Sequence, residues 1–230
     1  MRMKILAQVP LFAGLSELAL DGIDHRMVSL SYAEGDRLYS AGDPANYLYV
    51  VAAGQVKTLQ PALNGNDSIL DILAPGEFLG GLTVLGRPVY GETAMALVTT
   101  CALRIGTDAF REVLLEYPEI ALRALDDVTA LLQEARSDTS QRATSTVAQR
   151  VATTLLQLAG KFGQHGGSGD GTLIQLPLSR ADLAAMTGST PESVSRVMSQ
   201  LRKDGVVDTG RRWTSILDHN KLTAIAAAEE

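Results

Sequence analysis

The feature that most constrains the fold of this chain is the stretch from Ser179 to Lys203, SRADLAAMTGSTPESVSRVMSQLRK. Its pattern predicts two short amphipathic helices joined by a tight turn. Ser179 and Asp182, three residues apart, form a capping-box-like start for the first helix. Gly188 is expected to end that helix, because glycine adopts a positive φ at little cost.

The second helix of this pair is predicted to begin after Ser189 or Thr190, either of which can cap it, with Pro191 in the first helical position. Its apolar residues recur at helical spacing and mark one buried face: Val194, Val197, Met198 and Leu201. Two helices joined in this way are typical of a helix-turn-helix. In that motif the second helix enters the major groove of DNA with its N-terminal residues against the base edges.

The polar face of the second helix carries three candidate base-reading residues. Glu192, Ser195 and Arg196 lie at i, i+3 and i+4, which brings them to one side, opposite the valines. An arginine can donate two hydrogen bonds to guanine, and a glutamate can accept one from a cytosine amino group. The alternative is a solvated surface with a Glu–Arg pair. The turn, the caps and the segment that follows favour DNA reading.

A β-hairpin is predicted directly after these helices, from Gly205 to Leu217, GVVDTGRRWTSIL. A hairpin in this position makes a winged helix-turn-helix, and Arg211 and Arg212 at its tip are expected to contact phosphate. Hydroxyl groups near the two helix starts complete the predicted DNA-backbone contacts: Ser179, Ser189, Thr190 and Ser193.

Net charge supports this interpretation once the chain is divided. The 230 residues together carry −6, of which residues 1–139 carry −8, residues 140–216 carry +4 and the remaining tail carries −2. The positive excess therefore lies in the predicted DNA-reading segment, where phosphate contacts require it. A net charge of +4 is small for a DNA-binding segment. We therefore expect a homodimer, which brings two such segments to the DNA, rather than a monomer.

The rest of the composition argues against several classes of protein. A hydrophobic share of 46% and a charged share of 20% are those of an ordinary soluble globular protein. No apolar run approaches the ~18 residues of a membrane span, and the basic start lacks the apolar segment and cleavage site of a signal peptide. Cys101 is the only cysteine, so no disulfide is expected. We expect a cytoplasmic protein without a membrane partner.

Short strands separated by turns are predicted between Val28 and Ile105, after a short helical start over residues 1–23. Asn64-Gly65-Asn66 is a hairpin signal within this region. Strands this short, with turns every eight to twelve residues, favour an antiparallel sandwich or barrel. The expected strands begin at Val28, Leu38, Tyr47, Val56, Ile69, Ala94 and Ala102.

A dimerisation helix is predicted to follow a helix over residues 107–116. Its apolar residues have the 4-3-4-3 spacing of a heptad seam: Ala121, Leu125, Val128, Leu132 and Ala135. About two heptads are too few for an isolated coiled coil but enough for a dimer helix that packs on its own domain. The alternative is a helix whose apolar face lies on its own barrel.

A further helix is predicted from Thr146 to Phe162, followed by a glycine-rich segment from Gly163 to Gly171 and a short strand from Leu173 to Leu176. The glycines lack the preceding strand and following helix of a phosphate loop, so the segment is interpreted as a flexible connector.

This order of elements resembles the Crp/Fnr family of bacterial transcription regulators, which are related to the cyclic-AMP receptor protein. The resemblance covers essentially the whole chain, and five segments carry it: Gly35-Asp36, Ala41 to Lys57, Pro75 to Phe78 with Gly80, Arg150 to Leu158, and residues 179–217. It implies an α+β fold with an N-terminal antiparallel β-roll or jelly-roll of the cyclic-nucleotide-binding type (1–115). A long dimerisation helix and hinge (116–145) and a C-terminal winged helix-turn-helix domain (146–230) follow.

The resemblance also implies a homodimer on a palindromic promoter site, because two recognition helices must reach half-sites one helical turn apart. RNA polymerase is an expected partner if the protein is an activator. In the cyclic-AMP receptor protein an arginine reads guanine immediately before the glutamate, and Pro191 stands at that position here. Glu192, Ser195 and Arg196 match the Glu-x-x-Ser-Arg pattern of the Fnr-like subgroup, which implies TTGAT-type rather than TGTGA-type half-sites.

The effector pocket implied by the resemblance is degenerate. In the segment Gly76-Glu77-Phe-Leu-Gly80-Gly81, Gly81 stands where cyclic-AMP binders have a ribose-binding glutamate. Glu92-Thr93 falls near their phosphate-binding Arg-Ser pair, and Ala135-Arg136 aligns with their adenine-contacting Thr-Ser. A carboxylate in that place would repel a phosphate. Ordinary cyclic-AMP binding is therefore not expected; the alternative is a non-standard pocket in which Arg87 serves the phosphate.

No cofactor is expected. One Cys101 cannot hold the iron–sulfur cluster of Fnr, and it is interpreted as a small core residue. Haem needs axial ligands, but only His25 is near the sensory domain; all three histidines, with His165 and His219, are interpreted as surface residues. The remaining possibilities are an unidentified ligand or constitutive DNA binding regulated by protein abundance.

Two other classes of function are weaker interpretations. If the chain were a ligand-binding regulatory module that does not bind DNA, the predicted helix-turn-helix region of residues 179–217 would have no function. An enzyme on a cupin-like barrel would need a His/Glu metal site in its strands, and residues 28–105 contain no histidine. The sequence therefore predicts a DNA-binding transcription regulator that is not an enzyme.

Overall fold

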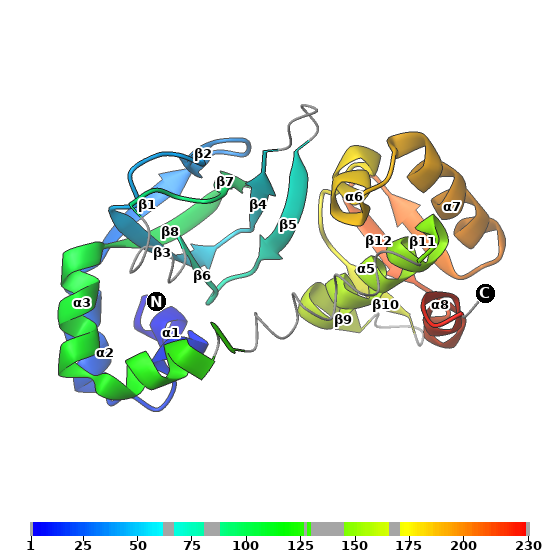
Figure 1. Cartoon of the computed structure of the whole chain (residues 1–230). Helices are drawn as coiled ribbons and strands as arrows, with labels where there is room; N and C mark the ends of the chain where they lie inside the picture. The colour runs from blue at the N-terminus through cyan, green and yellow to red at the C-terminus, as the bar shows by residue number, and fades with distance from the viewer. Residues whose placement is uncertain are drawn as a thin grey trace. The chain divides into compact units, whose positions relative to one another are not determined.

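The computed structural model describes residues 2–61, 67–80, 88–126, 128–129, 145–165 and 171–228. The chain divides into two compact units, Met1–Arg136 and Ser137–Glu230 (Figure 1). Within the described residues, no helix combines the length and the apolar character needed to cross a membrane.

The N-terminal unit is built on two antiparallel sheets of four strands each. The first sheet has the order β1 (Val28–Tyr32), β8 (Thr100–Gly106), β3 (Tyr47–Ala53) and β6 (Phe78–Leu79). The second has the order β2 (Arg37–Tyr39), β7 (Thr93–Ala96), β4 (Val56–Gln60) and β5 (Ser68–Leu73). Both sheets contribute buried side chains to one hydrophobic core. The predicted antiparallel β architecture is confirmed.

Strand pairing agrees with the turn signals. β4 and β5 pair from Val56↔Leu73 to Gln60↔Ser68, so they flank the predicted hairpin signal as antiparallel neighbours. The Asn64-Gly65-Asn66 turn itself lies outside the described residues. β6 is an element that the sequence pattern does not predict, because two residues are too few to show the alternation of a strand.

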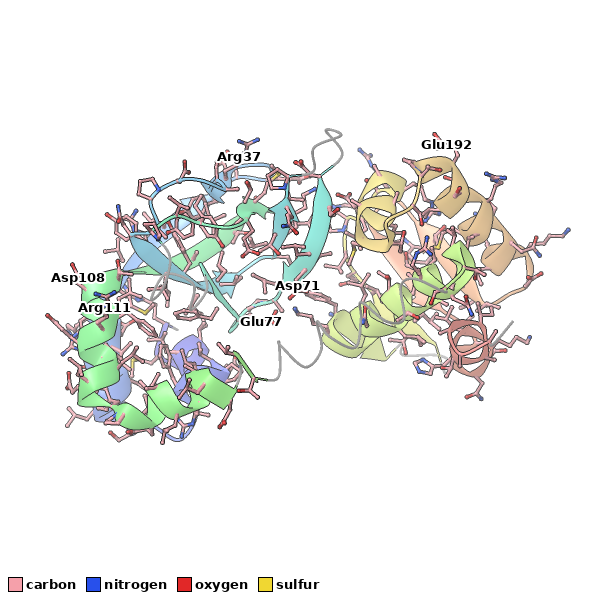
Figure 2. The ribbon with its side chains drawn as sticks, in the orientation of Figure 1. Arg37, Asp71, Glu77, Asp108, Arg111 and Glu192 are labelled. Carbon is pink, nitrogen blue, oxygen red and sulfur yellow. The ribbon has the colours of Figure 1, made fainter. Side chains whose placement is uncertain are left out.

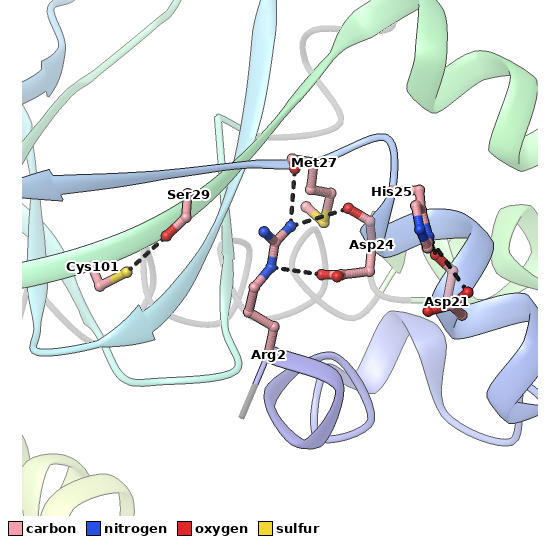
Figure 3. A network of polar contacts seen from close by, with 7 residues as sticks. All are labelled: Arg2, Asp21, Asp24, His25, Met27, Ser29 and Cys101. Carbon is pink, nitrogen blue, oxygen red and sulfur yellow. Dashed lines mark hydrogen bonds and ion pairs between the residues drawn. The ribbon is translucent and has the colours of Figure 1, made fainter.

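Three short helical segments precede the strands: α1 (Arg2–Leu6), η1 (Pro10–Phe12) and α2 (Glu17–Asp24). Arg2 fastens α1 to the end of α2, because its guanidinium donates to the Asp24 carboxylate and to the Met27 carbonyl, each at 2.9 Å (Figure 3). Cys101, also in Figure 3, is half-buried against the core with its Sγ 3.3 Å from the Ser29 hydroxyl.

α3 (Thr107–Glu116) has the predicted bounds and is followed by its C-cap residue Tyr117; residues 118–126 are again helical. This second helix is the start of the predicted dimerisation helix. Its continuation through residues 130–144 lies outside the described residues.

The C-terminal unit combines helices with a sheet of four strands. α5 (Val147–Phe162), the helix predicted from Thr146 to Phe162, is capped by Thr146, and α6 (Arg180–Thr187), α7 (Pro191–Lys203) and α8 (His219–Ala226) follow. The sheet has the order β11 (Val207–Gly210), β12 (Trp213–Ile216), β10 (Thr172–Ile174) and β9 (Gly163–His165).

The interpretation of Gly163 to Gly171 as a flexible connector is wrong at its start. Gly163 to His165 form strand β9, which pairs with β10 from Ile174↔Gly163 to Thr172↔His165. A Cβ on Gly163 would overlap the Ala159 carbonyl oxygen and the Thr172 side chain. Glycine therefore lets the chain turn directly from α5 into the sheet, which is a packing role that its sequence context does not reveal.

Candidate nucleic-acid interface

α6 begins and ends at the predicted residues. The Ser179 hydroxyl accepts a hydrogen bond from the Asp182 amide at 3.0 Å, and the Asp182 carboxylate accepts one from the Ser179 amide at 2.9 Å. These two bonds form the expected capping box. Gly188 follows the last turn with φ 58°, the left-handed conformation that glycine adopts without a Cβ penalty. Local sequence therefore fixes both ends of the helix.

α7 begins at Pro191, after Thr190, whose hydroxyl accepts a hydrogen bond from the Ser193 amide at 3.2 Å. Of the two possible caps, Thr190 therefore caps the helix. The face of α7 directed into the unit consists of buried Val194, Met198 and Leu201 with half-buried Val197. Because α7 packs with this face towards α5 and α6, its opposite face is directed to solvent.

That opposite face presents the three predicted base readers together. Glu192 and Arg196 are exposed and Ser195 is half-buried, and Figure 2 shows Glu192 at the outer surface of the unit. Hydrogen bonds from its own backbone N–H and from the Thr190 hydroxyl lower the pKa of Glu192, with a smaller effect from Arg196. The side chain is therefore held as a carboxylate, the form that can accept a hydrogen bond from a cytosine amino group.

The hydroxyl groups predicted to contact phosphate are engaged within the unit. Ser179 Oγ donates within its capping box at 2.6 Å, Thr190 Oγ1 lies 3.2 Å from Ser193 Oγ, and Ser189 Oγ donates to the Thr187 carbonyl at 3.3 Å. Because a phosphate oxygen can only accept, these three hydroxyls must change their acceptor when DNA binds. Their role at the DNA backbone stays a prediction.

The wing has the predicted form. Gly210 pairs with Trp213 at the end of the β11–β12 ladder, so Arg211 and Arg212 are the two residues of the turn. Both are exposed. A Cβ on Gly210 would overlap the Trp213 ring, which accounts for a glycine at this position. The tip of the wing therefore carries two guanidinium groups, the chemistry that contacts phosphate.

Arg150 contacts the turn between α6 and α7, and its sequence context does not predict a role at the interface. It is in the first turn of α5 and donates from Nε to the Thr187 carbonyl at 2.7 Å and from Nη2 to Ser189 Oγ at 3.1 Å. A third bond runs from Nη1 to the Ser145 carbonyl. An arginine early in an amphipathic helix is the available sequence signal. This signal does not predict which residues the arginine contacts, because Thr187 and Ser189 lie 37 and 39 residues further along the chain.

In the N-terminal unit, the segment that resembles a nucleotide pocket is held by a tyrosine and a carboxylate. Gly76 and Gly80 adopt φ values of 90° and 89°. The Gly80 amide donates to Tyr39 Oη at 3.0 Å, and the Tyr39 hydroxyl donates to the Glu92 carboxylate at 3.2 Å. Glu77 closes the same turn, because its carboxylate accepts from the Ala74 amide at 2.6 Å.

Glu92 and Thr93, which the resemblance places near the phosphate of a cyclic nucleotide, are both engaged within the unit. Burial raises the pKa of Glu92, the hydrogen bond from Tyr39 lowers it, and the charge of Asp71 raises it again. Thr93 is buried, and its hydroxyl already accepts from the Ala41 amide at 3.0 Å. A half-buried carboxylate near the expected phosphate position opposes an anion. The other predicted pocket residues lie outside the described residues: Gly81, Arg87, Ala135 and Arg136.

Known proteins match both units. Residues 29–117 match the cyclic nucleotide-binding domain, and residues 149–225 match the Crp-like helix-turn-helix domain. "Probable transcriptional regulator flp" of Lacticaseibacillus casei is 31% identical over 223 residues, covering 96% of this chain and 97% of that protein. The chain belongs to the Crp/Fnr family. Residues 149–225 are accordingly a Crp-type DNA-binding domain.

Other Crp/Fnr proteins are similar over nearly the same length. The CRP-like cAMP-activated global transcriptional regulator of Mycobacterium tuberculosis is 24% identical over 220 residues, 95% of this chain and 97% of that protein. The structure of FixK2 from Bradyrhizobium japonicum matches with a TM-score of 0.77 at 24% identity, over 89% of this chain and 99% of that chain. The latter likeness confirms the Crp/Fnr fold, and the names of the L. casei and M. tuberculosis relatives describe transcriptional regulators.

The helix that carries the heptad seam in this Crp/Fnr chain has two apolar faces. Ile120 and Ala124 are buried in the core of the N-terminal unit. In contrast, the seam residues Leu125 and Val128 are 63% and 43% exposed, and Ala121 is half-buried. The alternative in which this apolar face lies on its own barrel does not hold for Leu125 and Val128. The remaining seam positions, Leu132 and Ala135, lie outside the described residues.

Proposed function

We propose that this chain regulates transcription as a homodimer that binds a palindromic promoter site with TTGAT-like half-sites. Glu192, Ser195 and Arg196 read the bases, and Arg211 and Arg212 contact the DNA backbone. DNA binding does not depend on cyclic AMP, and an activator of this kind would also contact RNA polymerase in the cytoplasm. The protein is a regulator and not an enzyme.

One observation carries the proposal: the three base readers share the solvent-facing side of α7 while the opposite side is packed. A helix fixed in this way can present its N-terminal residues to the major groove without reorganisation. Pro191 at the start of the helix and the Glu-x-x-Ser-Arg pattern favour TTGAT over TGTGA, by the resemblance to the Fnr-like subgroup.

Two further observations support the finer parts of the proposal. The exposed seam residues Leu125 and Val128 supply an apolar surface of the kind that a second copy would cover. The Glu92 carboxylate, bonded to Tyr39, opposes a phosphate in the pocket segment. The M. tuberculosis relative is described as cAMP-activated, so a cyclic-nucleotide-responsive regulator with a non-standard pocket is the second candidate.

Fluorescence anisotropy of the purified protein on a TTGAT-N4-ATCAA duplex, at stated salt and with and without cyclic AMP, tests both candidates. Equal, tight binding in the two conditions is expected. Binding only with the nucleotide would overturn effector independence and support the second candidate. A stronger preference for a TGTGA palindrome would overturn the half-site assignment, and absence of binding to either duplex in both conditions would count against the proposed site.

The Arg196→Ala substitution tests the base-reading assignment. Loss of two hydrogen bonds to guanine should weaken binding to the matching duplex by about 1–3 kcal/mol and relax the preference at that base pair. Arg211→Ala is the matched control: loss of a phosphate contact should weaken binding on every sequence and reduce the salt slope by about 1. Uniform weakening by Arg196→Ala would make Arg196 a phosphate contact instead.

A further inference from the structure

The three hydrogen bonds of Arg150 join three places in the C-terminal unit. Its guanidinium reaches the Thr187 carbonyl at the end of α6, the Ser189 hydroxyl in the turn between α6 and α7, and the Ser145 carbonyl just before α5. Guanidinium donors are charge-assisted and have a fixed planar geometry, so they hold their partners in direction as well as in distance. Arg150 is therefore placed to fix the helix-turn-helix turn relative to the start of α5.

The oxygen atoms that accept hydrogen bonds from Arg150 lie where a positive charge is favourable. Thr187 is the last residue of α6, where the carbonyl groups lack helical partners and carry the negative end of the helix dipole. Thr187 itself is buried, and its hydroxyl donates back to the Leu183 carbonyl at 2.7 Å. Ser189 completes the arrangement, because it accepts from Arg150 and donates to the Thr187 carbonyl.

The turn that Arg150 contacts determines the orientation of α7. Only Gly188, Ser189 and Thr190 separate the end of α6 from Pro191, and Glu192 follows directly. A change in the direction of this turn therefore changes the direction of the first helical turn of α7, where the predicted base readers begin. The bond to Ser145 ties the same turn to the residue that precedes the Thr146 cap of α5.

We propose that Arg150 is a positioning residue for DNA reading, which sets the orientation of α7 by tying the turn before it to the start of α5. This inference rests on the proposed function, because it concerns the same interface. Arg150 does not touch DNA in this proposal. Its contribution appears in the ratio of specific to non-specific affinity and not in the number of phosphate contacts.

The test compares Arg150→Lys with the protein as it exists. Lysine keeps the positive charge but cannot donate in three fixed directions. The duplex is the sequence that the unmodified protein selects from a random pool, and a scrambled duplex of equal length measures non-specific binding. Arg150→Lys should lower the ratio of specific to non-specific affinity by about 3- to 30-fold. The salt slope should stay unchanged, because no phosphate contact is removed.

Further variants and a folding control show whether an effect is specific to the Arg150 hydrogen bonds. Arg202→Lys is the matched control, because Arg202 lies in the last turn of α7 and pairs with Asp208 at 3.1 Å, away from the turn; its specificity ratio should not change. Ser189→Ala removes one acceptor and should give a partial effect that is not additive with Arg150→Lys. Circular dichroism confirms that each variant is folded at the assay temperature, and Arg150→Met provides a second loss of the hydrogen bonds.

The outcomes separate this proposal from the proposed function. An unchanged specificity ratio in folded Arg150→Lys and Arg150→Met would overturn the positioning role. Equal weakening on both duplexes with a smaller salt slope would make Arg150 a phosphate contact and would also overturn it. If the unmodified protein selects a sequence other than TTGAT, the half-site assignment fails while the positioning role can still hold. If it selects no sequence, both fail.

Discussion

At the scale of single residues, the Glu92 carboxyl group links three parts of the N-terminal unit. The Tyr39 hydroxyl, on β2, donates to it and accepts from the Gly80 amide, so the carboxyl helps to hold the turn after β6. The ring of Tyr39 stacks on Tyr90 with centroids 3.8 Å apart. An ionisable group in such a packed place has a cost when it is charged, because burial disfavours the carboxylate.

This cost predicts a pH-dependent stability. The pKa of Glu92 is raised in the folded protein above its ordinary value of 4.5, chiefly by burial. The folded state therefore binds the proton more tightly than the unfolded state, and this contribution to the free energy of unfolding is lost as the pH rises through the folded pKa. Glu92→Gln, which stays neutral and still accepts from Tyr39, should raise the melting temperature at pH 7 and leave it unchanged at pH 4.

Thermal unfolding at the two pH values measures the effect. Glu112→Gln, at an exposed position of α3, is the control and should change the melting temperature at neither pH. A Glu92→Gln variant that is less stable than the unmodified protein at pH 7 would contradict the prediction. That result would mean that the charged carboxylate contributes a favourable interaction.

At the scale of elements, the turn between α6 and α7 depends on Gly188. Its φ of 58° is costly for any residue with a Cβ, yet a Cβ there would meet no atom within 4 Å. Gly188→Ala should therefore lower the free energy of unfolding of the C-terminal unit by about 1–2 kcal/mol through the backbone alone. For a unit of this size, each kcal/mol lowers the melting temperature by roughly 4–8 °C.

Gly160→Ala is the matched control in the same unit. Gly160 lies within α5, has no positive φ and has open space around it. Alanine is the better helix former, so this change should raise the free energy of unfolding by about 0.5–1 kcal/mol. Opposite shifts of the two variants in denaturant unfolding confirm the argument. A neutral Gly188→Ala would show that the turn can relax out of the left-handed conformation.

At the scale of the whole molecule, the proposed homodimer makes a prediction about the heptad seam. Leu125 is 63% exposed in the isolated chain, and a charged side chain there would have to be buried without a partner in a dimer. Leu125→Glu should convert the dimer to a monomer of 24.4 kDa in sedimentation or light scattering. It should also weaken binding to the palindrome by at least about tenfold, because the two half-sites are then bound separately.

Leu115→Glu is the control for this change. Leu115 is 83% exposed on α3 and does not belong to the seam, so the variant should remain dimeric. A Leu125→Glu variant that stays dimeric would place the interface elsewhere. Unmodified protein that is monomeric at micromolar concentration and on DNA would overturn the homodimer itself.

Local sequence alone predicts much of the DNA-binding unit. The cap at Ser179, a cap at Ser189 or Thr190, the positive φ at Gly188 and the buried face of α7 all follow from residues within four positions of one another. Helix geometry couples i to i+3 and i+4, so the responsible side chains are neighbours in the sequence as well as in space. For the same reason, the Glu192, Ser195 and Arg196 face is predictable without a structure.

Only the tertiary structure decides the contacts between distant segments. The sheet order β1-β8-β3-β6, the Tyr39–Glu92 bond and the bonds from Arg150 to Thr187 and Ser189 join residues that lie far apart in the sequence. Hydrophobic periodicity and turn residues do not predict such contacts, since each contact depends on how whole elements pack. The sequence by itself therefore determined that α6 and α7 form and which residues α7 presents. The packing of the elements decided what holds that helix in place.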